Sequence, residues 1–394
     1  MTQRQDGAHQ DCVDRVEVFF LRMPREVGLH MGRRPEVNER GYIIDPDNGT
    51  IYPADDRTLI VKITTRDGRI GWGETYGIAA AGAVKAIIAD IIAPVLRGRD
   101  PLDAGVIWQD FYNMMRVRGY TGGFYVDALA AIDIALWDLA GKILGQPVAK
   151  LLGGRRRDRI PAYVTNIAGS TIEARIASVQ AMWDKGFRAF KVHASASFDY
   201  IDLVRQLRER FGADIQLMVD LHWNHTSAEA LTICRKLEAY NLLFLEAPCR
   251  YEDIDGLARV ARSSSIAIAG GEEWRTLYDA QARLQAEAVT VIQPEMGRSG
   301  ITQFMKMATL AEAHHARVMP HATIGFGIFM AASLQASAAI EDLPLHEYQN
   351  TVLPRHLPHF DTTMVCDNGF YNVPDAPGLG IEPRDSLWQF VVEP

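Results

Sequence analysis

The sequence has few cysteines, no excess of basic charge and no long uninterrupted apolar run. Its four cysteines are far apart among 394 residues and form no CxxC pair. A zinc site or a disulfide framework is therefore not expected, and reduced thiols in a cytoplasmic protein are the simplest interpretation. The formal net charge is −8, from 41 basic and 49 acidic side chains, whereas a nucleic-acid-binding protein would carry a basic patch.

Nothing in the sequence indicates a membrane segment. The N-terminus has no apolar stretch of the kind found in signal peptides. The most apolar segment, residues 126–145, contains Asp127, Asp133 and Asp138. Three carboxylates in such a short segment argue against a membrane span and predict a buried amphipathic helix. We therefore expect no membrane and no nucleic acid as partners.

The length allows one to three domains, and 48% hydrophobic with 23% charged residues is typical of a globular protein. Alternating apolar residues predict strands at 13–23 and 57–68, and the long connection between them is more often functional than idle. Helical spacing follows at 79–98, 101–117 and 126–145. Strands followed by helices predict an α+β domain over residues 13–150.

Single acidic or imidazole residues stand at the ends of short apolar runs in the second half of the chain. They are His193, Asp220, Glu246, Glu272, Glu295, His321 and Glu347. The steps between the last six are 26, 26, 23, 26 and 26 residues. One strand, one helix and two loops take about that length. The pattern predicts repeated βα units, each with one polar residue where its strand ends.

Strands are expected near residues 162, 189, 217, 243, 267, 290, 317 and 345. Eight is the number that closes a (β/α)8-type, TIM-like barrel, which we assign to residues 151–350 within an α/β fold class. Parallel strands of a barrel end on one face, where active sites lie. Residues 351–394 return to strand and turn patterns and are expected to pack on the N-terminal domain.

Asp220, Glu246 and Glu272 would be neighbours at three successive strand ends. Three carboxylates so close together would repel one another and raise each other's pKa. A divalent cation removes this conflict, and a few oxygen ligands with open positions suit Mg²⁺ better than Ca²⁺. Glu273 is a rival ligand, but Glu272 falls on the 26-residue step. The alternative is three separate ion pairs.

At this point the chain resembles a known family. The segments WGE, FKVH, GGEEW, VIQPEMGRSG, PHATIGFG and PDAPGLGIE, with the three carboxylates, are similar to the mandelate racemase-like subgroup of the enolase superfamily. The resemblance covers nearly the whole chain. It implies a modified barrel with an N-terminal capping domain completed by the C-terminal tail, one Mg²⁺ per site and a homo-oligomer between dimer and octamer. It also implies removal of the proton α to a substrate carboxylate, and Asp220, Glu246 and Glu272 as metal ligands.

Lys191 and His193 alternate on one predicted strand and so point to the same face. The family usually has lysine at both positions, and the second usually acts as the base. Histidine titrates near neutrality without help, so His193 is a candidate base or acid. Lys191 could stay charged beside the substrate carboxylate. The alternative for His193 is a hydrogen-bonding role without proton transfer.

Glu295 and His321 follow two neighbouring strands. A carboxylate bonded to one imidazole nitrogen fixes the tautomer and raises the basicity of the ring. The family normally has aspartate where Glu295 stands, so its extra methylene leaves the dyad geometry open, and a plain ion pair is the alternative. Glu347 matches the glutamate on the last strand of the family, which holds the substrate carboxylate as a neutral acid with a raised pKa.

His222 lies two residues after Asp220 and is expected to share its face, and some acid-sugar dehydratases of the family have a histidine there that expels the leaving hydroxide. The substrate-binding candidates lie in the long N-terminal connection, which covers the barrel mouth in the family. They are His30, Arg33, Arg34 and Tyr42. A solvated loop is the alternative for each.

The leading hypothesis is a Mg²⁺-dependent dehydratase of a sugar acid, an aldonate or aldarate, with a 2-keto-3-deoxy acid as product. A racemase or epimerase would use the same proton transfers without loss of hydroxide, and a cycloisomerase is a weaker third. A non-catalytic sugar-acid-binding relative is the alternative from another class.

Overall fold

The computed structural model describes residues 11–25, 36–322 and 325–393. Three of the predicted substrate-binding residues lie outside this range: His30, Arg33 and Arg34. Within it, no helix is long and apolar enough to cross a membrane. All four cysteines are described and none is in a disulfide.

The chain opens with an antiparallel sheet. Its main strands are β1 (Val13–Met23), β4 (Asp56–Thr65) and β5 (Ile70–Tyr76), with the C-terminal β18 (Val391–Val392) on the edge of β1. Alternate residues of β4 face opposite sides, since Leu59 and Val61 pack with the N-terminal helices while Ile60 joins the core shared with the barrel. Between β1 and β4, β2 (Tyr42–Ile44) and β3 (Ile51–Pro53) form a hairpin.

The helices of this domain are α1 (Ala81–Ile87), α2 (Ala93–Leu96), α3 (Ala104–Arg116) and α4 (Gly123–Leu144), with a π-helical turn at 88–92. The predicted helix at 126–145 is α4, which ends where Gly145 takes φ 64°. It is buried on nearly every side because it lies between the sheet and the barrel. Its three aspartates each have a partner: Asp127 with Arg275, Asp133 with Thr302 and Asp138 with Lys142.

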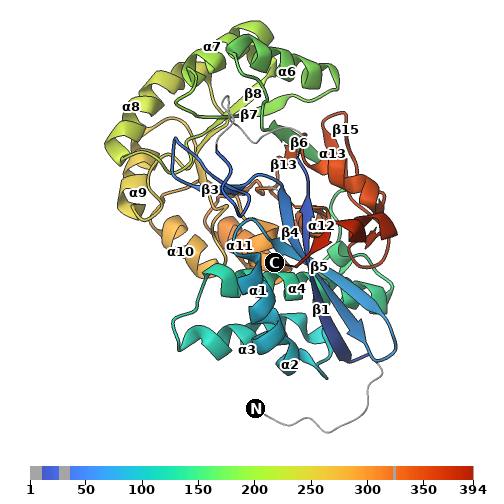
Figure 1. Cartoon of the computed structure of the whole chain (residues 1–394). Helices are drawn as coiled ribbons and strands as arrows, with labels where there is room; N and C mark the ends of the chain where they lie inside the picture. Colours follow the sequence, from blue (N-terminus) through green and yellow to red (C-terminus); the bar gives the residue numbers. More distant parts are fainter. Residues whose placement is uncertain (1–10, 26–35, 323–324, 394) are drawn as a thin grey trace.

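The barrel prediction is confirmed (Figure 1). All eight strands lie near the expected positions. They are β6 (Arg159–Thr165), β7 (Ala189–His193), β8 (Gln216–Asp220), β9 (Phe244–Glu246), β10 (Ile268–Gly270), β11 (Val291–Ile292), β12 (Arg317–Val318) and β13 (His346–Gln349). The order runs from β12 down to β6, which also pairs with β13. The ring closes irregularly, where Glu347 N donates to Pro320 O at 3.3 Å.

Seven helices alternate with these strands. They are α6 (Ile172–Asp184), α7 (Tyr200–Phe211), α8 (Ser227–Leu237), α9 (Ile254–Ser263), α10 (Leu277–Gln285), α11 (Met296–Ala313) and α12 (Ile328–Ala339). The short α5 (Val148–Leu151) leads into the barrel, and only the short α13 (Leu353–His356) follows β13. One buried cluster contains Tyr163, Ala189, Met218, Phe244, Ala269, Val291, Met319 and Leu345. These residues come from successive strands or their ends, so they fill the barrel interior beneath the strand ends.

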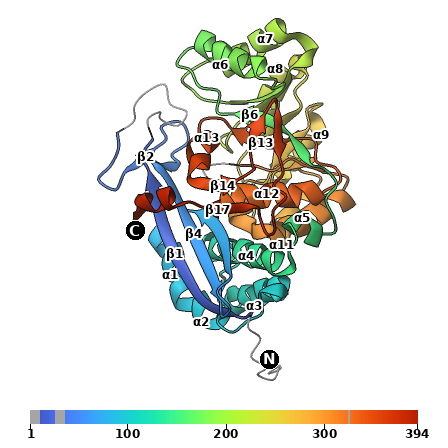
Figure 2. The same cartoon turned by 90° about the vertical axis from the view of Figure 1, so that its right-hand side faces the viewer.

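The C-terminal segment returns from the barrel to the first domain (Figure 2). Its strands are β14 (Phe360–Thr362), β15 (Cys366–Asp367), β16 (Phe370–Asn372), β17 (Ile381–Pro383) and β18. β16 pairs with β6 of the barrel, whereas β18 pairs with β1. Glu382 accepts a hydrogen bond from the Trp72 ring, and Leu379 N donates to Asp138. The tail therefore connects the barrel to the sheet of the first domain.

Candidate active site

The predicted catalytic and metal-ligating residues lie at the C-terminal ends of the barrel strands. Lys191 and His193 are on β7, and the metal candidates follow on β8, β9 and the segment after β10. Register alone brings some of them together, because His193 is paired with Asp220 and Asp220 with Glu246 across parallel strands. The strand ends place the side chains in one small, largely buried volume.

The three metal candidates have different partners. Glu246 Oε2 accepts from Lys191 Nζ at 2.9 Å and from Gln293 Nε2 at 2.8 Å. Glu272 Oε2 lies 3.0 Å from His321 Nε2, whereas Asp220 faces two histidines. Each carboxylate therefore meets a basic or donor group from another strand end.

The donor set fits a hard divalent cation. Glu246 Oε1 is buried without a hydrogen-bond partner. Burial raises the pKa of Glu246 to about 8, although the Lys191 ammonium acts in the opposite direction. A buried oxygen with no partner, beside two more carboxylates at neighbouring strand ends, is the arrangement that Mg²⁺ would satisfy.

The rival ligand Glu273 has different surroundings from Glu272. Both of its carboxylate oxygens are buried without partners, and burial raises its pKa to about 8 with Glu272 adding to the effect. Glu272, by contrast, contacts His321 and forms a potential metal-binding group with it and Glu246. The contact with His321 and the group shared with Glu246 support Glu272 as the ligand, while the two partnerless oxygens of Glu273 keep it as the rival.

His321 and Glu295 form a close pair despite the extra methylene of the glutamate. His321 Nδ1 lies 2.6 Å from Glu295 Oε2, and both residues are buried. The two backbones pair directly beyond β11 and β12. Burial alone would lower the pKa of His321, but the carboxylates around it raise this pKa to about 10. The arrangement is a carboxylate–imidazole dyad whose Nε2 points to Glu272.

Lys191 and Glu347 form a second buried pair, with 2.9 Å between Nζ and Oε1. Burial disfavours the ammonium, but Glu246 and Glu347 outweigh it and keep the pKa of Lys191 well above its ordinary value. Burial would raise the pKa of Glu347, but Lys191 and His321 lower it to about 2. Two cationic groups therefore lie against this carboxylate in the ligand-free site, and a neutral Glu347 beside a bound substrate carboxylate stays a prediction.

The opposite side of the site contains His193 and His222. His193 Nδ1 lies 3.2 Å from Asp220 Oδ2 and 3.2 Å from His222 Nε2. Thr165 Oγ1 is 2.8 Å from the other ring nitrogen of His193. His222 adopts φ 50°, and its N–H donates to Asp220 Oδ1 at 2.9 Å. A non-glycine residue in this backbone region is uncommon and is often found at functional sites.

The β2–β3 hairpin lies against the barrel mouth. Asp47 in its turn accepts hydrogen bonds from Ser195 Oγ and Ala196 N, just after β7. Burial raises the pKa of Tyr52, with Glu272 adding to the effect. Tyr42 is held within the capping domain instead, where its ring lies 4.4 Å from the Arg57 guanidinium. The structure thus brings Tyr52 rather than Tyr42 to the other candidates.

Two capping-domain residues that the sequence analysis did not select support the dyad. Glu74 accepts hydrogen bonds from Phe326 N at 2.5 Å and Phe329 N at 2.9 Å, at the N-terminus of α12. Thr75 Oγ1 donates to Gly297 O at 2.6 Å, in the first turn of α11 that Glu295 caps. Both barrel helices that follow the dyad are therefore held from the capping domain. In the sequence, only the WGE segment, which contains Glu74, pointed to this region.

Arg298 was also missed. It lies in the first turn of α11, with its guanidinium 4.6 Å from the centre of the Tyr76 ring. Burial would lower the pKa of Arg298, but Tyr76, Asp127 and Glu272 raise it. It therefore adds a half-buried positive charge close to the metal candidates.

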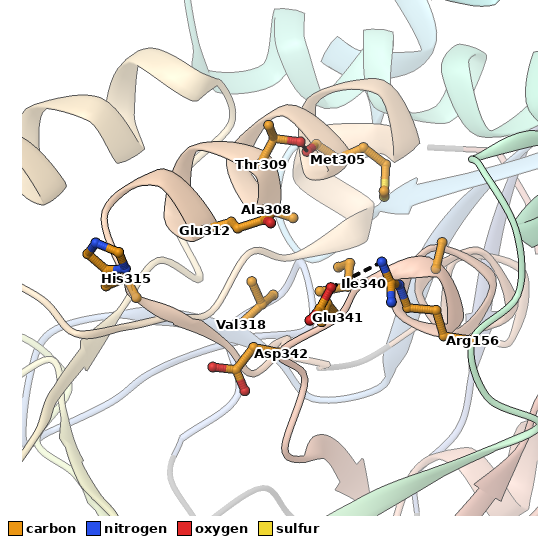
Figure 3. Close-up of a pocket in the computed structure, with 12 residues that line it drawn as sticks. Arg156, Met305, Ala308, Thr309, Glu312, His315, Val318, Ile340, Glu341 and Asp342 are labelled. Carbon is orange, nitrogen blue, oxygen red and sulfur yellow. Dashed lines mark hydrogen bonds and ion pairs between the residues drawn. The ribbon is translucent and has the colours of Figure 1, made fainter.

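A cavity of about 450 Å³ lies at the other end of the barrel (Figure 3). It is lined by the end of α11, the start of β12 and the loop before β13, including His315, Glu312 and Asp342. These segments precede the strands, so the cavity is remote from the strand ends that hold the chemistry. Its charged side chains are exposed, as in the Arg156–Glu341 pair at 3.1 Å.

The fold and site together define a barrel protein with acidic and imidazole side chains gathered at one face. Residues 174–387 match the model described as enolase C-terminal domain-like. Residues 51–153 match the mandelate racemase / muconate lactonizing enzyme N-terminal domain. The chain belongs to the enolase superfamily, in its mandelate racemase-like acid-sugar subgroup.

Two relatives with named activities are similar to this chain over most of its length. The chain is 33% identical over 347 residues to D-galactarolactone cycloisomerase from Agrobacterium fabrum, covering 84% of this chain and 90% of that protein. It is 31% identical over 356 residues to D-galactonate dehydratase from Ralstonia nicotianae, covering 86% and 92%.

Two solved structures share the whole architecture. A member of the enolase superfamily from Agrobacterium tumefaciens has a TM-score of 0.94 and 42% identity, with 97% of this chain and 99% of that chain covered. A racemase from Streptomyces coelicolor with bound magnesium has a TM-score of 0.83 and 27% identity, with 96% and 100% covered.

Proposed function

We propose that the protein is a Mg²⁺-dependent dehydratase of a sugar acid, an aldonate or an aldarate. The observation that carries the proposal is the placement of imidazoles on two sides of the three carboxylates. The His321–Glu295 dyad meets Glu272, while His193 and His222 meet Asp220. Loss of water from neighbouring carbons needs one group to take a proton and another to give one.

Asp220, Glu246 and Glu272 would hold the cation. When bound, Mg²⁺ would offset their charge and draw electron density from the substrate carboxylate, which acidifies the α-carbon and lowers the pKa of His321 towards that of a useful base. Lys191 remains charged beside the substrate carboxylate, held between Glu246 and Glu347.

The histidines on the two sides of the carboxylates would divide the proton transfers between them. His321 Nε2 takes the α-proton, and Glu295 stabilises the resulting imidazolium through Nδ1. The electron pair of the C–H bond forms a C=C bond, and the β-carbon–oxygen bond breaks. A proton held between His193 and His222 goes to the leaving hydroxide, which departs as water. The enol then tautomerises to the 2-keto-3-deoxy acid.

The test is incubation of the enzyme and Mg²⁺ with a library of aldonic and aldaric acids, followed by an assay for 2-keto acids. We expect turnover of at least one member that is abolished by a chelator. No turnover of any member would exclude the dehydratase.

A racemase or epimerase is the second candidate, because the two sets of imidazoles could exchange the α-proton on both faces of one carbon. Exchange of the α-proton with solvent deuterium, without keto-acid formation, would favour it. The named activity of the Agrobacterium fabrum relative keeps a cycloisomerase as a third candidate. Activity lost in His321→Asn would rule out a non-catalytic binding protein.

A further inference from the structure

Three potential metal-ligand atoms converge around the two histidines that we propose as the proton donor. His193 Nδ1, His222 Nε2 and Asp220 Oδ2 lie 3.2, 3.2 and 3.3 Å from one another. They come from the ends of β7 and β8, and the three residues form a potential metal-binding group that contains neither Glu246 nor Glu272. The triangle is therefore a different donor set from the three-carboxylate site, with Asp220 in common.

The edges of this triangle match a coordination polyhedron. Metal–nitrogen and metal–oxygen bonds of about 2.0–2.2 Å place neighbouring ligand atoms about 3.0 Å apart in an octahedron and about 3.4 Å apart in a tetrahedron. The observed distances of 3.2 to 3.3 Å fall between these values. One ion could therefore bind all three atoms with little movement of the side chains.

The surroundings of the triangle orient its ligands. Thr165 Oγ1 contacts His193 Nε2, which leaves Nδ1 directed at the triangle. The left-handed backbone of His222 and its N–H bond to Asp220 Oδ1 hold the second imidazole near the same carboxylate. Hydrogen bonds from beyond the ligands are what fix imidazole orientation in metal sites.

We propose that His193, Asp220 and His222 form a second cation site that takes a transition metal such as Zn²⁺ or Co²⁺ rather than Mg²⁺. Two imidazole nitrogens and one carboxylate oxygen suit these metals, whereas Mg²⁺ prefers oxygen ligands. An ion bound there occupies both histidines and draws on Asp220. It would inhibit the proposed dehydration by removing the acid and by weakening the Mg²⁺ site.

The test uses the metal-free full-length enzyme, saturated with Mg²⁺ and titrated with Co²⁺, whose visible absorption reports nitrogen ligation. We expect one equivalent of Co²⁺ to bind despite the excess of Mg²⁺. His222→Asn and His193→Asn should each weaken this binding by more than the roughly 10- to 100-fold typical of losing a group that only orients a ligand. Circular dichroism would show that both variants are folded.

Two control variants locate the ion. His225→Asn removes a half-buried imidazole from the same loop, outside the triangle, and should leave Co²⁺ binding unchanged. Glu272→Gln alters the three-carboxylate site and its contact with His321 but not the triangle, so it should also keep the Co²⁺ band. Loss of the band in Glu272→Gln, its retention in His222→Asn, or its absence in the wild type would each overturn the proposal.

The inference rests on the proposed function only for its kinetic consequence. The Co²⁺ titration uses no substrate, so its result stands whether or not a sugar acid is turned over. If turnover is found, Zn²⁺ should inhibit the wild type at concentrations that do not displace Mg²⁺ from Glu246 and Glu272. Turnover unaffected by bound Zn²⁺ would refute the inhibitory role while leaving the dehydratase proposal intact.

Discussion

The two ends of the barrel contain similar residue types in opposite environments. At the strand ends, Lys191 and Glu347 form an ion pair whose side chains are 0% and 1% exposed. At the other end, Arg156 and Glu341 pair with 54% and 70% of their side chains exposed. Water screens the charges of the second pair, and forming the pair requires two mobile side chains to become ordered. The pair therefore contributes little to the free energy of unfolding. Burial shifts the pKa values of charged residues, and groups with shifted pKa values are common at catalytic sites.

The largest expected difference between the two ends concerns histidine. His321→Asn should lower kcat by about 10²- to 10⁴-fold, because it removes a general base. His315→Asn, in the exposed cavity at the other end, should leave kcat within about twofold. Steady-state kinetics on whichever sugar acid is turned over measures both. Equal losses in the two variants would mean that His321 acts through the fold alone.

Removal of the buried Lys191 should cost more stability than removal of the exposed Arg156. Lys191→Met leaves Glu246 and Glu347 without their cation and should cost about 3–5 kcal/mol in the free energy of unfolding. Arg156→Met removes one partner of an exposed pair and should cost about 1 kcal/mol or less. Urea denaturation followed by fluorescence gives both values. A small effect of Lys191→Met would show that water reaches the strand ends.

Glu74 should show an intermediate effect. Glu74→Gln weakens the charge-assisted bonds to Phe326 N and Phe329 N, and we expect a loss of about 1–3 kcal/mol in stability. Because α12 and α11 adjoin the dyad, kcat should fall while KM changes little. Thr64→Val alters another hydroxyl of the same sheet that has no hydrogen-bond partner and serves as the control. An unchanged kcat in Glu74→Gln would confine this residue to a structural role.

Asp133 tests whether burial alone, away from the site, produces the same behaviour. Burial raises its pKa to about 7, although Thr302 donates two hydrogen bonds to it. The folded state then holds this proton more tightly than the unfolded state, so its contribution to stability is greatest below about pH 4 and declines as pH rises to about 7.

The matching variant is Asp133→Asn, which cannot ionise. From pH 5 to pH 8 the wild type should lose about 2–3 kcal/mol relative to this variant. Thermal or urea denaturation at the two pH values gives the difference. A gap between the two proteins that does not change with pH would mean that Asp133 stays charged throughout, with Thr302 outweighing burial.

Local sequence patterns were sufficient for most of the architecture. The alternation in 13–23 and 57–68 and the regular spacing after His193 predicted strands that the structure confirms. The spacing was informative because one βα unit has a nearly constant length and because parallel strands end on the same face. The same reasoning predicted that Asp220, Glu246 and Glu272 would be neighbours.

Contacts between residues far apart in the sequence could not be predicted from local patterns. Glu74 and Phe326 are 252 residues apart, and Thr75 and Gly297 are 222 apart, with no periodicity linking them. Tyr42 and Tyr52 belong to the same connection and differ only in where the hairpin directs them.

The sequence by itself determined which residue types stand at the barrel strand ends, because chain geometry dictates where each βα unit returns. Only the tertiary structure decided their charge and their partners. Lys191 and His321 lie against Glu347 and lower its pKa, although burial acts in the opposite direction. His193 and His222 meet on Asp220 because a left-handed residue turns the chain there. A pKa depends on every neighbouring charge and on burial, which are properties of the folded molecule.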